Sequence, residues 1–237
     1  MASWKLITRA DDFGASPGTN DAILDALRAG FIRNAGVMAP GPYLRHRLEE
    51  LVDLQEQVCL GLHAVVNSEW ETVRWGPILP VAQIPGLVEP DGTFHRSPGT
   101  TNEKATAEEI VAEIEAQLSA LRELGIRPRY LDCHMVFTWI EGVAPRLAEL
   151  CAREDLVFGN GPGFKQGSPG RNAELRETAT PDQRCVIIYH PAYRDNVSES
   201  FGTEVATARA DEARFVTDSI RFTPWLRQHD VVPETYA

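Results

Sequence analysis

Short apolar runs alternate with segments of helical periodicity along almost the whole chain. The runs predict strands at residues 6–10, 35–39, 58–66, 129–135, 157–159, 185–189 and 231–232. The run at residues 58–66 is nearly continuous in apolar residues, which is typical of a strand that is covered on both faces. Repeated β–α alternation over one core predicts a parallel sheet. The number of units favours an α/β fold built as one distorted, TIM-like (β/α) barrel with fewer than eight regular units.

Capping signals place three of the helices. Ser16 predicts the start of a helix that Gly30 ends. A capping box opens a second helix over residues 106–125. A third is expected from about residue 208 to residue 222, because Pro224 should stop it.

Residues 67–104 break the alternation. Within the single domain expected over residues 1–237 they form a long loop insertion, which holds Trp70, Trp75 and five prolines. A loop of this length is either a functional lid or binding loop, or a plain insertion. A second polar stretch, residues 161–184, shows little periodicity, and no role follows from its sequence.

Charge and cysteine content narrow the class of protein. The formal net charge of −11 over 237 residues argues against nucleic acid and anionic membranes as partners. The first residues lack the pattern of a secretory signal, and no apolar stretch is long enough to span a membrane. Four scattered cysteines are expected to be reduced core residues. We therefore expect a cytoplasmic protein, with a homodimer as an unsurprising assembly.

Four polar features stand at the carboxyl ends of predicted strands. They are the pair Asp11 and Asp12, then His63, then the segment 132–134 with His134, and finally His190. In a parallel barrel these ends form one face, where catalytic loops gather. Each feature alone has a structural explanation, such as a strand end or a hydrogen-bonded core histidine. Their joint placement favours one shared pocket.

One carboxylate and two neutral imidazoles can form a three-ligand site for a divalent ion, with positions left for water and substrate. This donor set suits zinc, cobalt, nickel or iron better than calcium. A second carboxylate can then act as a base, and a further histidine as an acid. Successive side chains of a strand alternate in direction, so Asp11 and Asp12 are expected to point apart and to divide these roles. His46, His95 and His229 are interpreted as surface residues.

These features resemble the YdjC-like carbohydrate deacetylases, which include the chitooligosaccharide deacetylases. Residues 10–20, ADDFGASPGTN, are very similar to the opening motif of that family. Residues 61–63 resemble its GLH motif, residues 132–134 its Asp-x-His motif, and residues 190–191 its late His-Pro. Residues 75–77 and 90–94 also resemble one branch of the family, and the resemblance covers nearly the whole chain.

The resemblance implies a distorted barrel related to NodB-type polysaccharide deacetylases, and metal-dependent removal of acetyl groups from N-acetylated sugars. Carried over by position, Asp12, His63 and His134 would bind one divalent ion, with zinc favoured by ligand type and magnesium, cobalt or nickel as alternatives. Asp11 would be the base and His190 the acid, although the two aspartates could exchange roles.

The sequence departs from the family's pattern at three positions. Val136 and Thr138 stand where many members carry further histidines, and Arg9 precedes the aspartates where a smaller polar residue is common. Arg9 could pair with an aspartate or bind substrate.

The leading hypothesis is a hydrolase that deacetylates a small N-acetylated saccharide, with Trp70 or Trp75 against a sugar ring or else packed within the loop. An O-acetyl esterase or non-sugar amidohydrolase on the same barrel is a second hypothesis. A catalytically inactive sugar-binding relative is the third.

Overall fold

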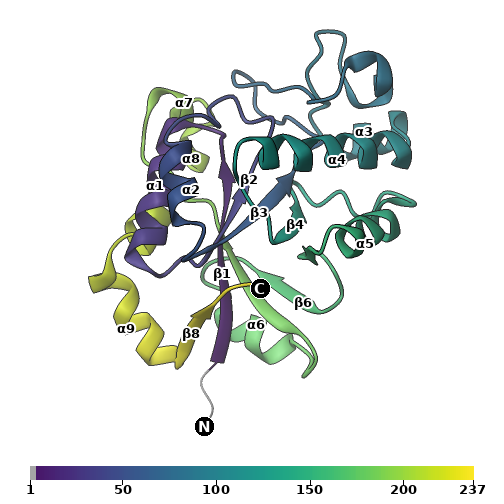
Figure 1. Ribbon diagram of the computed structural model, residues 1–237. Helices are drawn as coiled ribbons and strands as arrows, with labels where there is room; N and C mark the ends of the chain where they lie inside the picture. Colours follow the sequence, from purple (N-terminus) through teal and green to yellow (C-terminus); the bar gives the residue numbers. More distant parts are fainter. Residues whose placement is uncertain (1–3) are drawn as a thin grey trace.

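Within residues 4–237, the strands form one parallel sheet of eight members that curls into a half-barrel (Figure 1). This computed structural model describes residues 4–237. The order across the sheet is β5-β4-β3-β2-β1-β7-β6, and β8 pairs with the first half of β1. The strands are β1 (Trp4–Phe13), β2 (Asn34–Val37), β3 (Cys59–Ala64), β4 (Tyr130–Cys133), β5 (Val157–Phe158), β6 (Phe164–Gly167), β7 (Arg184–Tyr189) and β8 (Val231–Glu234). The expected distorted barrel is thereby confirmed.

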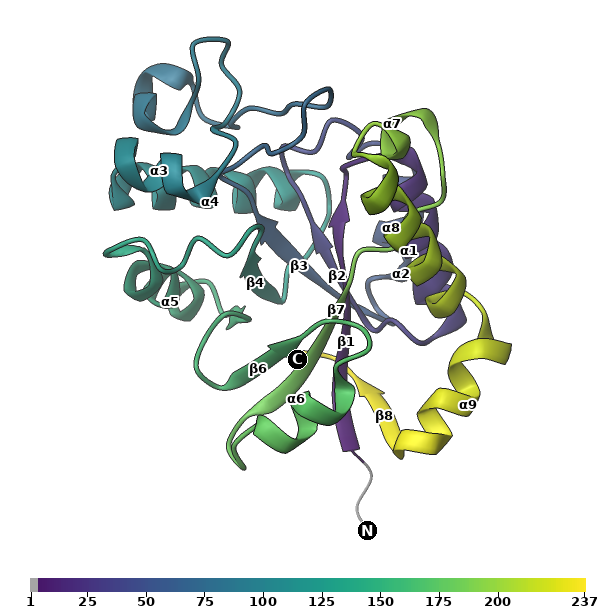
Figure 2. The same cartoon turned by 180° about the vertical axis from the view of Figure 1, so that it is seen from behind.

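Helices cover the outside of this sheet. In Figures 1 and 2, α1, α8 and α9 lie on one side, and α3, α4 and α5 lie on the other. Their bounds are α1 (Pro17–Ala29), α2 (Leu48–Leu54), α3 (Pro98–Lys104), α4 (Ala107–Glu123), α5 (Val143–Arg153), α6 (Asn172–Thr178), α7 (Asn196–Glu199), α8 (Thr203–Val216) and α9 (Ser219–His229). Among the helices described in residues 4–237, none combines the length and the apolar character needed to cross a bilayer.

The predicted caps of the first two helices are confirmed. The Ser16 side chain accepts the backbone N–H of Thr19, and Gly30 ends α1 with a φ of 88°. At the start of α4, Thr106 and Glu109 form the reciprocal capping box. These caps depend on groups within four residues of each other, which explains why the sequence alone locates them.

The helix predicted over residues 208–222 is wrong in its bounds. The chain forms two helices instead, because Asp218 interrupts the run and caps α9 by accepting the N–H of Ile220. Pro224 lies inside α9 rather than after a helix end. Pro224 is the sixth residue of α9, so its missing N–H leaves the carbonyl of Ile220 without its usual helical partner.

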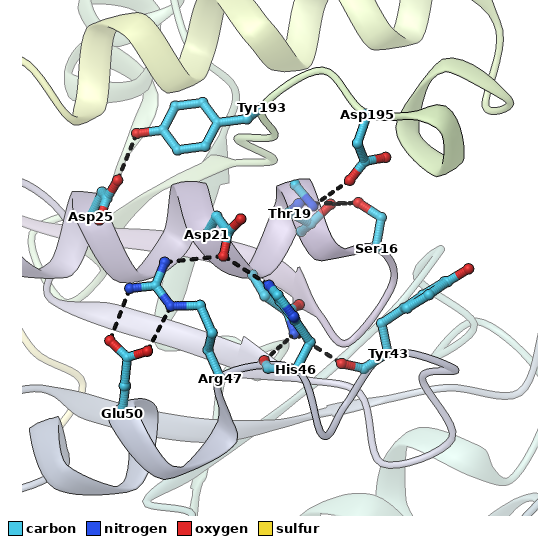
Figure 3. Close-up of polar contacts among 12 residues, drawn as sticks. Ser16, Thr19, Asp21, Asp25, Tyr43, His46, Arg47, Glu50, Tyr193 and Asp195 are labelled. Carbon is cyan, nitrogen blue, oxygen red and sulfur yellow. Dashed lines mark hydrogen bonds and ion pairs between the residues drawn. The ribbon is translucent and has the colours of Figure 1, made fainter.

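Long-range polar contacts hold α1 in place beside the sheet (Figure 3). On one side, the Tyr193 hydroxyl donates to Asp25, and Asp195 accepts the N–H of Gly18. On the other side, Asp21 lies within hydrogen-bond distance of His46 and Arg47, which precede α2. These contacts fix the helix that directly follows the turn after Asp11 and Asp12.

The two irregular segments contain more structure than their sequences indicate. Residues 67–104 include the 3-10 helices Val81–Gln83 and Pro85–Leu87 as well as α3. Within them His95 is buried, since its ring contacts Glu89 and the carbonyl of Gly86, so its interpretation as a surface residue is wrong. Residues 161–184 supply β6 and α6. All four cysteines are buried and unpaired, as predicted: Cys59, Cys133, Cys151 and Cys185.

Candidate metal centre and active site

A cavity of about 500 Å³ lies at the carboxyl ends of the strands. The five polar residues predicted from the sequence all line it: Asp11, Asp12, His63, His134 and His190. A larger hollow of about 960 Å³ lies at the opposite end of the sheet, around Lys5, Arg33 and Arg184, and contains none of the five. The polar features at the strand ends therefore share one site.

The two tryptophans take different places. Trp70 lines the cavity and is partly buried, with one ring face stacked on Phe201 at a centroid distance of 4.5 Å. Trp75 is buried in the core, where its ring N–H donates to the carbonyl of Asn67 and its ring lies edge-on to His134. The structure thus brings Trp70, and not Trp75, to the cavity wall.

An irregularity in β1 directs both aspartates into the cavity. The pairing of β1 with β2 shifts register between Ala10 and Phe13, and Asp12 has a φ of 74°. The expectation that Asp11 and Asp12 point apart is therefore wrong, because strict alternation holds only for regular extended backbone. A left-handed conformation at a residue other than glycine is costly, and such residues cluster at functional sites.

Two glycines make room for buried side chains inside the half-barrel. Gly36 and Gly61 are neighbours across β2 and β3. A Cβ on Gly36 would lie 2.9 Å from Asp11 Oδ1, and a Cβ on Gly61 would lie 2.3 Å from the ring of Tyr130. Any larger residue at either position would displace a buried side chain next to the site.

Three donor atoms of the cavity form a nearly equilateral triangle. His63 Nε2 lies 3.2 Å from His134 Nδ1, and each nitrogen lies 3.3 Å from Asp12 Oδ1. Donors around one tetrahedral zinc ion stand about 3.3 Å apart, since each is about 2.0–2.1 Å from the ion. Asp12 Oδ1 is buried and has no hydrogen-bond partner of good geometry. These observations fit a divalent cation held by Asp12, His63 and His134.

A second group of donors, Asp11, His63 and Asp132, also lies close together. The guanidinium of Arg9 occupies this side, since its Nη2 lies 2.7 Å from Asp11 Oδ2 and 2.9 Å from Asp132 Oδ2. A bound cation would compete there with a buried positive charge. The first group is therefore the better metal site.

Each histidine of the triangle has a carboxylate on its other ring nitrogen. His63 Nδ1 lies 2.8 Å from Asp132 Oδ2, and His134 Nε2 lies 3.0 Å from Glu69 Oε2. Because an ionised carboxylate only accepts hydrogen bonds, these contacts place the N–H groups away from the triangle. The lone pairs of His63 Nε2 and His134 Nδ1 are then directed toward Asp12, as metal ligands require.

The electrostatics of the site favour positive charge at the triangle. Burial lowers the pKa of His134, but Glu69 and Asp12 outweigh burial and raise it to about 9. Burial likewise opposes protonation of His63, while Asp132 and Asp11 raise its pKa well above the usual value. Burial disfavours the charged form of Asp12, yet Arg209 and the two imidazoles hold its pKa well below the usual range. The same carboxylates that favour protonation of the histidines would also stabilise a metal ion bound in place of the protons.

His190 and Glu212 also line the cavity. Burial lowers the pKa of His190, so its imidazole is neutral near pH 7. Burial also raises the pKa of Glu212 to about 7, although the carboxylate accepts the backbone N–H of His190. A neutral imidazole and a carboxyl group with a pKa of about 7 thus line the same cavity as the metal triangle.

The sequence pattern of the YdjC-like protein family matches residues 5–159. The chain belongs to this family. A carbohydrate deacetylase of Halalkalibacterium halodurans is 30% identical over 216 residues, which cover 81% of this chain and 87% of the relative. A carbohydrate deacetylase of Enterococcus faecalis is also 30% identical, over 135 residues, and there the chain spans about half of the relative (49%).

A solved structure from Enterococcus faecalis V583, described as a cellobiose-phosphate cleavage protein, has a similar fold. The TM-score is 0.83 at 20% identity, and the alignment covers 99% of this chain and 98% of that one. At this level of identity the likeness concerns the fold alone.

Several residues of this YdjC-like site escaped prediction from the sequence. Arg209 of α8 donates to Asp12 Oδ2 at 2.7 Å, from a helix face that it shares with Ala206, Ala210 and Ala213. An arginine among alanines on one face of a helix indicates that its charge is paired with a buried group. Glu69 carries no such signal, because it lies in a segment without periodicity.

The segment 161–184 also contributes to the cavity. Gln166, Gly167, Ser168 and Pro169 line its wall, and Gln166 donates to the carbonyl of Gly159 across the open edge of the half-barrel. On the β4 side, Met135 and Val136 line the cavity with positive φ values of 55° and 43°. The metal triangle forms without a histidine at position 136.

Proposed function

We propose that this YdjC-like protein is a metal-dependent hydrolase that removes the acetyl group from a small N-acetylated saccharide. The observation that carries the proposal is the triangle of Asp12, His63 and His134 in one cavity with Asp11 and His190. Two relatives named carbohydrate deacetylase support the sugar substrate. A bound divalent ion, with zinc favoured by the donor set, would lower the pKa of a water molecule and polarise the acetyl carbonyl.

Asp11 is the general base of this proposal. Arg9 Nη2 donates to Asp11 Oδ2, while Asp11 Oδ1 is buried without a hydrogen-bond partner. One oxygen of the carboxylate is therefore fixed in place and the other is able to take a proton from the attacking water. Arg9 Nη1 in turn donates to the Tyr236 hydroxyl oxygen at 2.9 Å, so a buried hydrogen-bond network fixes the orientation of Asp11.

His190 is the general acid. An amide has a poor leaving group, and its nitrogen must be protonated as the tetrahedral intermediate collapses. A histidine with a lowered pKa is a strong proton donor once it is protonated. Glu212, with a pKa of about 7, lines the same cavity, and its carboxylate accepts the backbone N–H of His190.

The substrate is an uncharged saccharide in this proposal. The two arginines of the cavity wall are both paired, Arg9 with Asp11 and Arg209 with Asp12. The carboxyl groups of Glu69 and Glu212 also line the cavity, so a sugar phosphate would meet carboxyl groups and no free side-chain cation among the described lining residues. The face of Trp70 not covered by Phe201 is suited to the apolar face of a pyranose ring.

Acetate release tests the function directly. The purified protein is incubated with neutral N-acetyl sugars, their 6-phosphates and O-acetyl sugars, with and without a chelator. Release from the neutral N-acetyl sugars, abolished by the chelator and restored by added zinc, is expected. Release that survives the chelator would refute metal dependence, release only from O-acetyl sugars would refute amide hydrolysis, and a preference for the 6-phosphates would refute the uncharged substrate.

A further inference from the structure

One carboxylate beside the metal triangle comes from outside the sheet. Asp132, the partner of His63, belongs to β4 and is fully buried. Glu69, the partner of His134, belongs to the segment that follows β3, and its side chain is 20% exposed. The orientation of His63 is therefore set by a residue of the sheet, whereas the orientation of His134 depends on the position of residues 67–75.

Trp70, the residue after Glu69, contacts Arg209, which in turn binds Asp12. The guanidinium of Arg209 lies 5.6 Å from the ring centre of Trp70 and 5.4 Å from that of Phe201. The same guanidinium donates to Asp12 Oδ2, which leaves Oδ1 for the triangle. Glu69 and Trp70 thus support His134 and Asp12 from two adjacent positions.

The segment is also tied to its own surroundings. The backbone N–H of Ser68 donates to the carbonyl of His95, and the Trp75 ring N–H donates to the carbonyl of Asn67. The edge of the Trp75 ring packs toward His134 as well. Displacement of the segment would therefore remove the hydrogen bond that orients His134.

We propose that Glu69 is a positioning residue that couples the seating of residues 67–75 to metal binding. It accepts the N–H of His134 Nε2 and so keeps Nδ1 directed toward Asp12 and His63. The segment closes one wall of the cavity only when this contact is made, and a bound cation strengthens the contact by fixing the imidazole. The inference rests on the metal-dependent function proposed above.

Zinc affinity of the substrate-free protein tests the coupling. Glu69→Ala is expected to weaken zinc binding by about 10–100-fold, the usual effect of removing a carboxylate that orients a ligating histidine. Glu69→Gln keeps an acceptor oxygen and should retain affinity within a few fold of the wild type. The matched control is Glu71→Ala, because Glu71 is 79% exposed and pairs only with Arg96 among the described residues. Dissociation constants come from competition with a chromogenic chelator.

Hydrogen exchange of residues 67–75 gives the second measurement. Zinc should slow exchange of this segment in the wild type and in Glu71→Ala, and should do so much less in Glu69→Ala. Circular dichroism of the metal-free variants checks that each one folds, and Glu69→Gln supplies the comparison if the alanine variant does not. Equal zinc affinity of Glu69→Ala and the wild type, or equal protection of the segment, overturns the inference alone. A wild-type chain that binds no zinc overturns the proposed function and the inference together.

Discussion

Replacing Glu212 by glutamine should change how the stability of the protein depends on pH. Burial raises the pKa of Glu212 from 4.5 to about 7. Between these two values the unfolded chain has released the proton and the folded chain has kept it. Folding then takes up a proton, so the free energy of unfolding of the wild type falls as the pH rises. Glu212→Gln removes this dependence and keeps an acceptor oxygen for the backbone N–H of His190.

The size of the effect follows from the same two pKa values. A span of about 2.5 pH units at about 1.4 kcal/mol per unit corresponds to about 3 kcal/mol. Relative to the wild type, Glu212→Gln should therefore gain about 3 kcal/mol of stability between pH 4.5 and pH 8, with most of the gain below pH 7. In a domain of this size that difference equals a relative shift in Tm of about 6–12 °C.

Urea unfolding of chelator-treated protein at a series of pH values measures this difference. Chelation is needed because a bound cation near Glu212 would favour its ionised form. The exposed Glu204→Gln on the same helix controls for the change in net charge. A stability difference between Glu212→Gln and the wild type that stays constant from pH 4.5 to pH 8 would refute the reasoning, since it would mean that burial does not perturb this carboxyl.

Three further predictions concern the roles of single residues. Asp12→Asn should weaken zinc binding, whereas Asp11→Asn should leave it nearly intact and lower kcat by roughly a hundredfold or more; zinc titration and initial rates that give the opposite pattern would exchange the two roles. His190→Ala should slow acetate release from an N-acetyl sugar by about 10²–10⁴-fold and affect an activated ester far less, because an alcohol leaving group needs little protonation; equal losses on both substrates would leave the acid unassigned. Trp70→Ala should raise KM by about two- to tenfold through loss of ring stacking, and an unchanged KM would show that the ring does not touch the sugar.

Local chemistry explains what the sequence determined. The alternation of apolar runs and amphipathic segments predicted the curled parallel sheet, since each pattern depends only on neighbours along the chain. The caps at Ser16 and Thr106 were predictable for the same reason. Parallel strands also place their carboxyl ends on one face, and this topology brings His63 and His134 to the same end of the half-barrel as Asp11 and Asp12.

Contacts between distant segments decided the rest. The left-handed φ of Asp12 cancels the alternation that would have turned one aspartate away. Arg209 reaches Asp12 across 197 positions of sequence, a separation at which no periodicity operates. Only packing buries Trp75 in the core and leaves Trp70 at the cavity wall.

The sequence by itself therefore determined the parallel half-barrel and the residues that meet at its mouth, because strand and helix patterns and strand polarity are properties of the chain. The tertiary structure decided which nitrogen of each histidine faces the triangle, which carboxylate stands behind it and which oxygen of Asp12 is left for a metal. Those choices depend on the hydrogen bonds that Glu69 and Asp132 accept from the two histidines and on the one that Arg209 donates to Asp12. Such bonds form only after the fold has brought separate segments within about 3 Å of each other.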